Sequence, residues 1–390
     1  MDAQTASVRL LFGQLMKGGF IMPRTNMRDL SFATFNLLNL QIPGGLTYSN
    51  RPPYPDDEEG KKNYYKKVMW TAMQIRRLDA EVIAFQELWA KQALIDVFEK
   101  AQLQNDYDIV ARDAPGRGKP QVALAVRKDR NKNSQLLDGW EWIETFPDNF
   151  KFDKLRESYG AEEEITVTID KFSRPILHAV IQPEGRSPKP PEISIYVAHL
   201  KSKGPARLSF AEPQPDALIH YAKITKSAVS HIRRIMEAGA MRAMLDAVMK
   251  CEDEDAISPV VLLGDLNDDT LSVTNELLSD QPTYRVVEKS SAGRSSDKGL
   301  YSAERLQQYR SSRHVYYTHI YKHKRESLDH ILVSEEFYDH SRKRLWSFRE
   351  LEVYNDHLNR EAFEEEGASD HGQVRAYFDW NPMPGEIDVT

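Results

Sequence analysis

The sequence contains one cysteine, Cys251, so no disulfide can form within a single chain and nothing in it depends on an oxidising compartment. It also lacks any run close to the ~20 apolar residues that a membrane-spanning helix needs. Positive charge is not in excess, because 52 lysines and arginines stand against 59 aspartates and glutamates, a net charge of −7. A chain of this charge repels polyanions as a whole, so a nucleic acid would have to be held by a local group of basic residues.

The first residues lack the regular patterns of the middle of the chain. An apolar stretch near the N-terminus is interrupted by Gln14 and Lys17, and no cleavage site of small residues follows it, which argues against a secretory signal. Strand and helix patterns begin only near residue 30. We therefore expect residues 1–29 to form a poorly ordered extension, residues 30–380 a single domain and residues 381–390 a tail, in a cytoplasmic protein.

Short apolar runs bounded by turn or polar residues predict β-strands, and helical periodicity is found between several of them. Strands are expected at residues 32–35, 82–85, 122–126, 193–197, 260–263, 314–320, 328–333 and 374–378. Helices are expected at residues 62–78, 91–102 and 215–250, with a break or bend at Gly239. Residues 140–164 and 183–191 are expected to be surface excursions. Because strands from both halves of the chain alternate with helices, we predict a four-layer αββα sandwich of two mainly antiparallel sheets with helices outside.

Polar residues stand at the ends of these apolar strands in six places. In chain order they are Asn36 in SFATFN, Gln86-Glu87 after VIAF, His199 after ISIYVA, Asp265 and Asn267 in VVLLGDLN, Asp329-His330 in LDHILVS, and Asp370-His371 in SDH. Carboxylates, carboxamides and imidazoles at so many strand ends predict one polar site on the rim of the sandwich. Oxygen-rich ligands of this kind suit a hard cation such as Mg²⁺ better than zinc, and with histidines nearby they suit hydrolysis of a phosphate ester.

The local context of these residues adds detail. A carboxylate that ends a buried strand, as at Glu87, is costly unless it is paired, and a divalent cation is a natural partner. The alternative is that Glu87 favours the N-terminus of the helix that follows. Asp265 and Asn267 are two residues apart, so in an extended segment their side chains point the same way. His330 points to the opposite face of its strand from Asp329 and is expected to be structural.

The order and context of these residues resemble the endonuclease/exonuclease/phosphatase superfamily of Mg²⁺-dependent phosphoesterases, from about residue 30 to 379. The resemblance implies a site for Mg²⁺, which Mn²⁺ could replace, with the ligands Asn36, Glu87 and Asp370. It implies that His371 is an acid–base residue oriented by Asp329. It also implies that Asp265 positions or deprotonates the attacking water in an in-line displacement, while Asn267 donates to a phosphate oxygen.

The segment VAHLKSKG indicates a branch of the superfamily. His199 resembles a histidine of the pancreatic-deoxyribonuclease, sphingomyelinase and deadenylase branches, and could protonate the leaving oxygen or stabilise the phosphorane. Lys201 and Lys203 complete a run that resembles bacterial predicted extracellular nucleases, and would bind substrate. The chain departs from those nucleases in lacking a signal peptide and paired cysteines, and from pancreatic deoxyribonuclease in lacking a recognisable glutamate to orient His199. Arg174 in SRPIL resembles a family arginine that either reaches phosphate or lies on the surface.

Three functions are compatible with these features. The first is a nuclease that cuts DNA or RNA, which His199 and the following lysines favour. Residues 313–324, RHVYYTHIYKHK, interleave basic and aromatic side chains that either stack on bases or form an ordinary exposed strand. The second is a phosphodiesterase or phosphatase acting on a phospholipid, inositol phosphate or nucleotide, for which Trp140 and Trp142 would offer a membrane-docking pair. The third is a non-catalytic scaffold.

Overall fold

The computed structural model describes residues 29–128, 134–150, 152–155, 165–206, 221–249, 257–282, 284, 299–311, 317–360 and 367–383. The extension predicted at residues 1–29 lies outside the described residues apart from Asp29, and so does most of the tail predicted at residues 381–390. The assignment of residues 30–380 to one domain stays a prediction.

Two large sheets form the centre of the molecule. The first, a six-stranded sheet, has the order β16 (Trp346–Tyr354), β17 (Gln373–Trp380), β1 (Asp29–Leu40), β2 (Val82–Leu88), β4 (Gln121–Arg127) and β3 (Tyr107–Val110). The second, a seven-stranded sheet, has the order β12 (Tyr301–Ser302), β15 (Asp329–Val333), β11 (Val260–Asp265), β10 (Ile193–His199), β9 (Lys171–Pro183) and β5 (Ser134–Leu136), and β6 (Glu141–Thr145) also pairs with β9. Each sheet contains one parallel pair, β1 with β2 and β10 with β11, among antiparallel neighbours.

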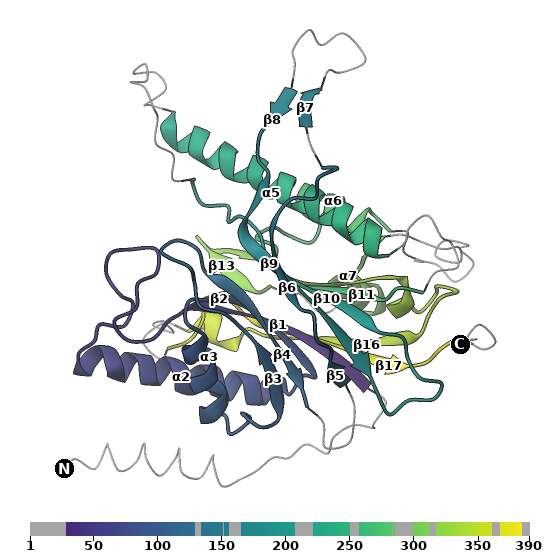
Figure 1. Ribbon diagram of the computed structural model, residues 1–390, viewed down its shortest axis with the longest axis horizontal. Helices are drawn as coiled ribbons and strands as arrows, with labels where there is room; N and C mark the ends of the chain where they lie inside the picture. The colour runs from purple at the N-terminus through teal and green to yellow at the C-terminus, as the bar shows by residue number, and fades with distance from the viewer. Residues whose placement is uncertain are drawn as a thin grey trace.

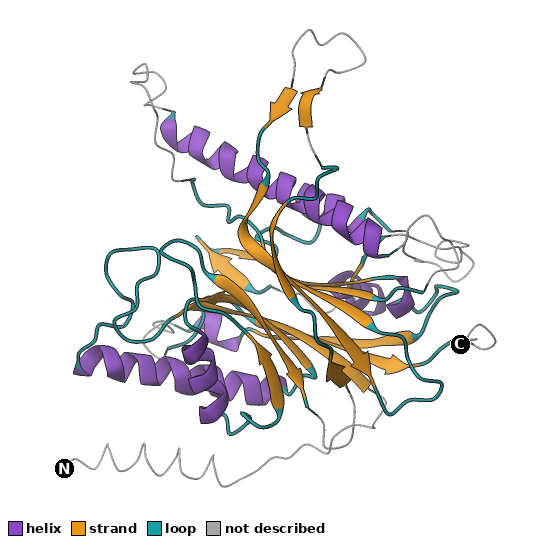
Figure 2. Ribbon diagram, in the orientation of Figure 1, coloured by secondary structure: helices purple, strands orange, loops and turns teal. Residues whose placement is uncertain are grey.

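Helices cover the outer faces of both sheets (Figure 1, Figure 2). The first sheet is covered by α2 (Glu58–Leu78) and α3 (Lys91–Lys100), and the second by α5 (Ala222–Val248) and α6 (Val273–Ser279). Shorter helices are α7 (Ala303–Arg310), η1 (Glu335–Phe337) and η2 (Asp356–Asn359). Two small hairpins complete the described fold, β7 (Phe152–Leu155) with β8 (Ile165–Val167) and β13 (His319–Tyr321) with β14 (Lys324–Glu326). This is the four-layer sandwich that the sequence predicts.

Side-chain alternation along the strands produces three hydrophobic layers. In β1, Phe32 packs into the core between the two sheets, whereas Ala33 and Phe35 pack toward α2 and α3. The same division in the second sheet places Val197 between the sheets and Tyr196 under α5. Because both faces of each sheet are covered, the central strands are apolar on both faces and only their ends can carry polar residues without cost.

The structure corrects two local predictions. Residues 140–164 are not wholly a surface excursion, because β6 is a strand of the second sheet, and Trp142 packs against the central core beneath the guanidinium of Arg112. Trp142 is therefore unsuited to docking on a membrane. The break predicted at Gly239 is also wrong, since α5 continues through it. A Cβ there would lie 2.8 Å from Phe150 Cζ, so this glycine allows a close approach of that ring to the helix.

Among the described helices, none has both the length and the apolar character needed to cross a membrane. The predicted connection at residues 183–191 does link β9 to β10, and Gln182 Nε2 donates to Pro190 O at 2.9 Å to hold it.

Candidate active site

The two parallel strand pairs bring the predicted polar residues to one edge of the sandwich. Asn36 in β1 lies beside Gln86 in β2, immediately before Glu87. His199 ends β10 beside Asp265, which ends β11, and Asp329 at the start of antiparallel β15 lies on the other side of Asp265. Parallel neighbours end at the same edge of a sheet and an antiparallel neighbour begins there, so this clustering follows from the topology.

Asp265 is the centre of the site. Its Oδ2 accepts a hydrogen bond from Asn36 Nδ2 at 3.0 Å, and its Oδ1 accepts one from the backbone N–H of Asn267 at 2.9 Å. His199 Nε2 and His371 Nε2 lie 3.4 Å and 3.9 Å from the same Oδ2. Burial raises the pKa of Asp265 to about 7, although the positive charge of His371 opposes the shift. A carboxyl group with a pKa near neutrality is suited to accept a proton from water.

His371 and Asp329 form a buried hydrogen-bonded pair. His371 Nδ1 lies 2.7 Å from Asp329 Oδ2, as the sequence predicts. Burial alone would lower the pKa of His371, but the carboxylates of Asp329 and Asp265 outweigh it and hold this pKa well above its usual range. Ser369 fixes the loop that carries His371, because its Oγ accepts from the His371 N–H at 3.1 Å and donates to Asn36 O at 2.7 Å.

Thr318 supports this pair and was missed by sequence reasoning. Its buried Oγ1 accepts the backbone N–H groups of Leu328 at 3.0 Å and Asp329 at 3.2 Å. Its carbonyl oxygen accepts the N–H of Gly372 at 2.6 Å. One residue thus fixes both the start of β15, which carries Asp329, and the loop that carries His371. No pattern in the sequence distinguishes it from other threonines.

His199 is buried beside Asp265, and its environment differs from that of His371. Burial, together with the positive charge of Arg174, holds the pKa of His199 well below its usual range, so the ring is neutral at neutral pH. Within the described residues its Nδ1 has no hydrogen-bond partner, in agreement with the lack of a recognisable orienting glutamate in the sequence. A neutral ring can still donate one hydrogen bond to a phosphate oxygen.

Glu87 and Asp370 carry carboxylate oxygens that could bind a divalent cation. Glu87 accepts one hydrogen bond, from the Asn39 N–H at 3.1 Å, and no described lysine or arginine forms an ion pair with Glu87 or Asp370. Burial raises the pKa of Glu87, and the negative charge of Asp370 raises it further. Two half-buried carboxylates that repel each other fit a bound cation. Asn36 Oδ1, which accepts the Leu38 N–H, lies on the neighbouring strand.

Two clusters in the described part of the chain have potential ligand atoms within 4.8 Å of one another. One contains His319, Asp370 and His371, and the other Asp265, Asp329 and His371. The hydrogen bond between His371 and Asp329 already accounts for the second cluster. The site therefore holds acidic and imidazole groups that could bind a divalent metal.

The three predicted substrate-binding residues lie in different environments. Arg174 is buried and donates to Leu200 O at 2.8 Å and to the Tyr48 hydroxyl at 3.4 Å, so the surface alternative is wrong. Lys201 is half-buried, and burial together with the charge of Arg174 lowers its pKa to about 8. Lys203 Nζ lies 2.8 Å from Glu326 Oε1 and 3.5 Å from Asp268 Oδ1, so its charge is already paired.

Two charged residues of α5 hold the loop that carries these lysines, and sequence reasoning missed both. Glu237 accepts the N–H groups of Ser173 at 2.7 Å and Lys201 at 2.8 Å. Arg234 donates to Lys201 O at 3.1 Å and to Asp268 Oδ2 at 3.2 Å. One feature of the sequence could have identified them. They are three residues apart among the apolar residues of an amphipathic helix, and a charged side chain on that face needs a buried partner.

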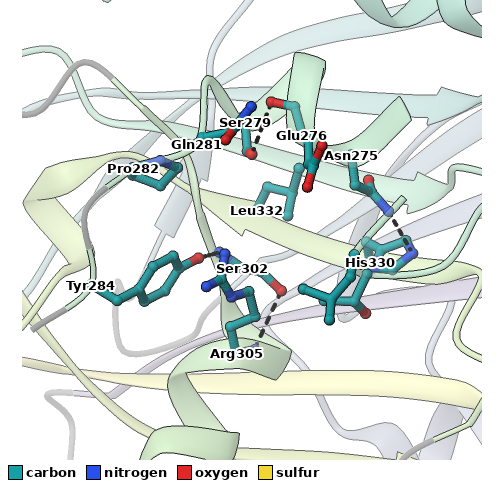
Figure 3. Close-up of a pocket in the computed structure, with 12 residues that line it drawn as sticks. Asn275, Glu276, Ser279, Gln281, Pro282, Tyr284, Ser302, Arg305, His330 and Leu332 are labelled. Atoms are coloured by element: carbon teal, nitrogen blue, oxygen red, sulfur yellow. Dashed lines mark hydrogen bonds between the residues drawn. The ribbon is translucent and has the colours of Figure 1, made fainter. Parts of the chain in front are cut away.

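His330 is structural, as expected, and faces away from the site. Its Nε2 contacts Asp268 O at 2.8 Å and Asn275 Nδ2 at 3.3 Å. It lines a cavity of about 270 Å³ with Tyr284, Arg305 and Leu332 among other residues, and Figure 3 shows Asn275 reaching toward the ring. Because His330 and Asp329 point to opposite faces of β15, this cavity is separate from the candidate active site.

The chain is similar to a known protein family and to several solved structures. No curated protein matches the chain. Similar solved structures include an endonuclease/exonuclease/phosphatase from Bacteroides vulgatus, with 16% identity over 90% of this chain and 99% of that one and a TM-score of 0.48. A humanized D. rerio TDP2 has 14% identity over 90% and 99% of the two chains and a TM-score of 0.48. ANGEL2, described as a 2',3'-cyclic phosphatase, has 14% identity over 90% and 96% and a TM-score of 0.47. A sequence model of the Endonuclease/Exonuclease/phosphatase family matches residues 68–371, so the chain belongs to this family of phosphoesterases.

Proposed function

We propose that the chain is a divalent-metal-dependent nuclease that hydrolyses phosphodiester bonds of DNA or RNA, with Mg²⁺ as its ion. The observation that carries the hydrolytic part is the network around Asp265, in which a carboxyl group with a pKa of about 7 faces the His371–Asp329 pair. Attack by water requires a base and departure of an alkoxide requires an acid, and Asp265 Oδ2 and His371 Nε2 are groups of these two kinds 3.9 Å apart.

The residues divide the proton transfers between them. Asp265 accepts a proton from water as the water oxygen attacks phosphorus, and Asn36 and the Asn267 N–H hold its carboxylate in place. His371, kept protonated by Asp329, faces the developing negative charge and supplies a proton to the leaving oxygen. A divalent cation held by Glu87 and Asp370, with Asn36 beside them, would neutralise charge on the phosphate oxygens.

Asn267 and His199 would bind the phosphate. One hydrogen of Asn267 Nδ2 is donated to Leu200 O at 3.0 Å, which leaves the second for a phosphate oxygen. His199 is neutral and can donate from Nε2. The nuclease proposal retains the support of the basic segment near residue 320, whereas the paired charge of Lys203 favours the second candidate, a phosphodiesterase or phosphatase for a phospholipid, inositol phosphate or nucleotide.

The test compares four substrates with purified protein: supercoiled plasmid, single-stranded DNA, RNA and bis-p-nitrophenyl phosphate. Each is incubated with Mg²⁺, Mn²⁺ or EDTA, beside the Glu87→Gln variant. Metal-dependent cleavage of a polynucleotide that is lost in the variant supports the proposal. Turnover of the small ester alone would replace it with the second candidate, and the absence of turnover on every substrate would favour a scaffold.

A further inference from the structure

The β13–β14 hairpin lies directly against the candidate active site. His319 in β13 forms an isolated antiparallel bridge with His371, and the centroids of the two rings are 4.9 Å apart. The hydrogen bond from Gly372 N to Thr318 O fixes the base of the hairpin to the His371 loop. The hairpin is also tied to the loop after β10, because Glu326 in β14 forms the 2.8 Å ion pair with Lys203.

A row of rings leads from the buried site to solvent along this hairpin. His371 is 7% exposed, His319 is partly exposed, and Tyr321 is 56% exposed. The rings of His319 and Tyr321 are nearly parallel, with an interplanar angle of 16° and centroids 6.4 Å apart. Residues two apart on a strand share a face, so the outer ring lies on the same side of the hairpin as the imidazole that faces the acid–base pair.

The tip of the hairpin concentrates positive charge in an acidic protein. Residues 321–325 are all exposed, and they contain Lys322, Lys324 and Arg325 without an acidic residue, in a chain of net charge −7. Within the described residues none of these three cations forms an ion pair. Nearer the catalytic residues, Lys203 is ion-paired and Arg174 is buried. The tip therefore adds cations without an ion pair close to the site, and one of them, Lys322, has its Nζ 5.3 Å from the centroid of the Tyr321 ring.

The turn of the hairpin places basic side chains where the backbone prefers other residues. Lys322 and His323 have φ values of 48° and 66°, in the left-handed region that two-residue hairpin turns fill mainly with asparagine, aspartate or glycine. A long cationic side chain at such a position is held in a strained conformation, and strain of this kind concentrates at functional sites.

We propose that this hairpin, residues 317–326, binds a single-stranded nucleic acid beside the scissile phosphate. A base stacks on the exposed ring of Tyr321, while Lys322 and Lys324 contact the phosphates that flank it. The inference rests on the proposed function and names its substrate class, since a ring can stack only on a base that is already free of its helix. The occupant is nucleic acid and not a lipid surface because the row of rings continues into the acid–base pair.

The test uses a labelled single-stranded DNA 12-mer and its RNA equivalent, with bis-p-nitrophenyl phosphate as a substrate that has no base. The variants are Tyr321→Ala, Tyr321→Phe and the double variant Lys322→Ala/Lys324→Ala. Tyr65→Ala is the matched control, because Tyr65 on α2 is 54% exposed and belongs to another face.

For Tyr321→Ala we expect KM for the oligonucleotide to rise about 5- to 100-fold, the range for loss of one base–aromatic stack. Tyr321→Phe should restore KM, and Tyr65→Ala should leave it unchanged. In the double lysine variant, the slope of the logarithm of the binding constant against the logarithm of the salt concentration should become shallower. The change should be about 0.7 for each phosphate that the lysines no longer neutralise.

Two failures can be told apart. If the wild type cleaves the oligonucleotide and Tyr321→Ala has an unchanged KM, the hairpin inference is wrong and the nuclease function stands. If the wild type hydrolyses only the small ester, and the Glu87→Gln protein in EDTA shows no anisotropy change with the 12-mer, the proposed function fails together with the inference. Sedimentation with phosphatidylserine vesicles that requires Tyr321, with oligonucleotide KM unaltered, would overturn the inference in favour of a membrane.

Discussion

Asn36 and Asp265 lie 229 positions apart and in different sheets, yet Asn36 Nδ2 donates to Asp265 Oδ2 at 3.0 Å. This hydrogen bond joins β1 of one sheet to the end of β11 in the other. It also lowers the pKa of Asp265, against the larger effect of burial that raises it. The same contact thus connects the architecture of the fold to the protonation of the group that we assign as the base.

We expect kcat/KM for bis-p-nitrophenyl phosphate to rise with pH through about 7, because protonated Asp265 cannot accept a proton from water. Added Mg²⁺ should move this limb to lower pH, since nearby positive charge favours the carboxylate. Asn36→Ala removes a hydrogen bond that lowers the pKa, so the limb should move to higher pH. Profiles of kcat/KM against pH at several Mg²⁺ concentrations check this, and a limb insensitive to both changes would contradict the role of Asp265.

Asp329→Asn should lower kcat by about 10²- to 10⁴-fold and move the alkaline limb of the pH profile to lower pH. The carboxylate of Asp329 raises the pKa of His371, so its loss deprotonates the imidazole at a lower pH and removes the acid. Circular dichroism must show an intact fold. Asp339→Asn, a carboxylate in a surface ion pair with Arg310, is the control and should retain full activity.

Glu87→Gln should make the protein more stable in EDTA and remove its stabilisation by Mg²⁺. The folded state raises the pKa of Glu87 above its unfolded value, so folding favours the protonated form, and the stability this confers is lost as pH rises through the folded-state pKa. At pH 7.5 the neutral glutamine avoids this loss, and Tm should rise by about 1–3 °C. In wild type, Mg²⁺ should raise Tm by mass action. Glu99→Gln, an exposed position on α3, should change neither quantity.

Gly264→Ala should strongly destabilise the fold. Gly264 has φ = +151°, and a Cβ there would lie 1.9 Å from Ala198 O, the residue paired with it on the parallel neighbour β10. Separating β10 from β11 to make room would disrupt the row of His199 and Asp265, with a loss that we expect to exceed about 3 kcal/mol. Urea denaturation measures it, and Gly116→Ala, where a Cβ meets nothing within 4 Å, is the control.

Much of the site could be predicted from sequence because strand ends are constrained by burial. In β2 and β11 an apolar run covered on both faces can end in Glu87 or Asp265 only where the strand reaches the rim. Parallel pairing places the polar residues of neighbouring strands at the same edge of each sheet, so the predicted residues from Asn36 to His371 lie close together.

The remaining residues depend on tertiary contacts that leave no local pattern. Thr318 and Glu237 act through backbone N–H groups of distant segments, so nothing in their own neighbourhoods marks them. The break predicted at Gly239 fails because intrinsic helix propensity was overridden by the packing of Phe150 against the helix. His319 was visible only as one member of a basic and aromatic segment until the bridge to His371 placed it.

The ion pair between Lys203 and Glu326 decides between two roles for Lys203. If the lysine contacts substrate phosphate, Lys203→Ala should weaken oligonucleotide binding, whereas Glu326→Ala should strengthen it by freeing the charge. If the pair holds the hairpin in place, as the 2.8 Å distance indicates, both single variants should raise KM by about 2- to 5-fold, in keeping with the ~1 kcal/mol of a partly exposed pair. The double variant should then have a KM no higher than that of either single variant.

Arg310→Ala, which breaks the 2.8 Å pair with Asp339, is the control. Opposite effects of Lys203→Ala and Glu326→Ala on KM would return Lys203 to the substrate path and remove it from the support of the hairpin.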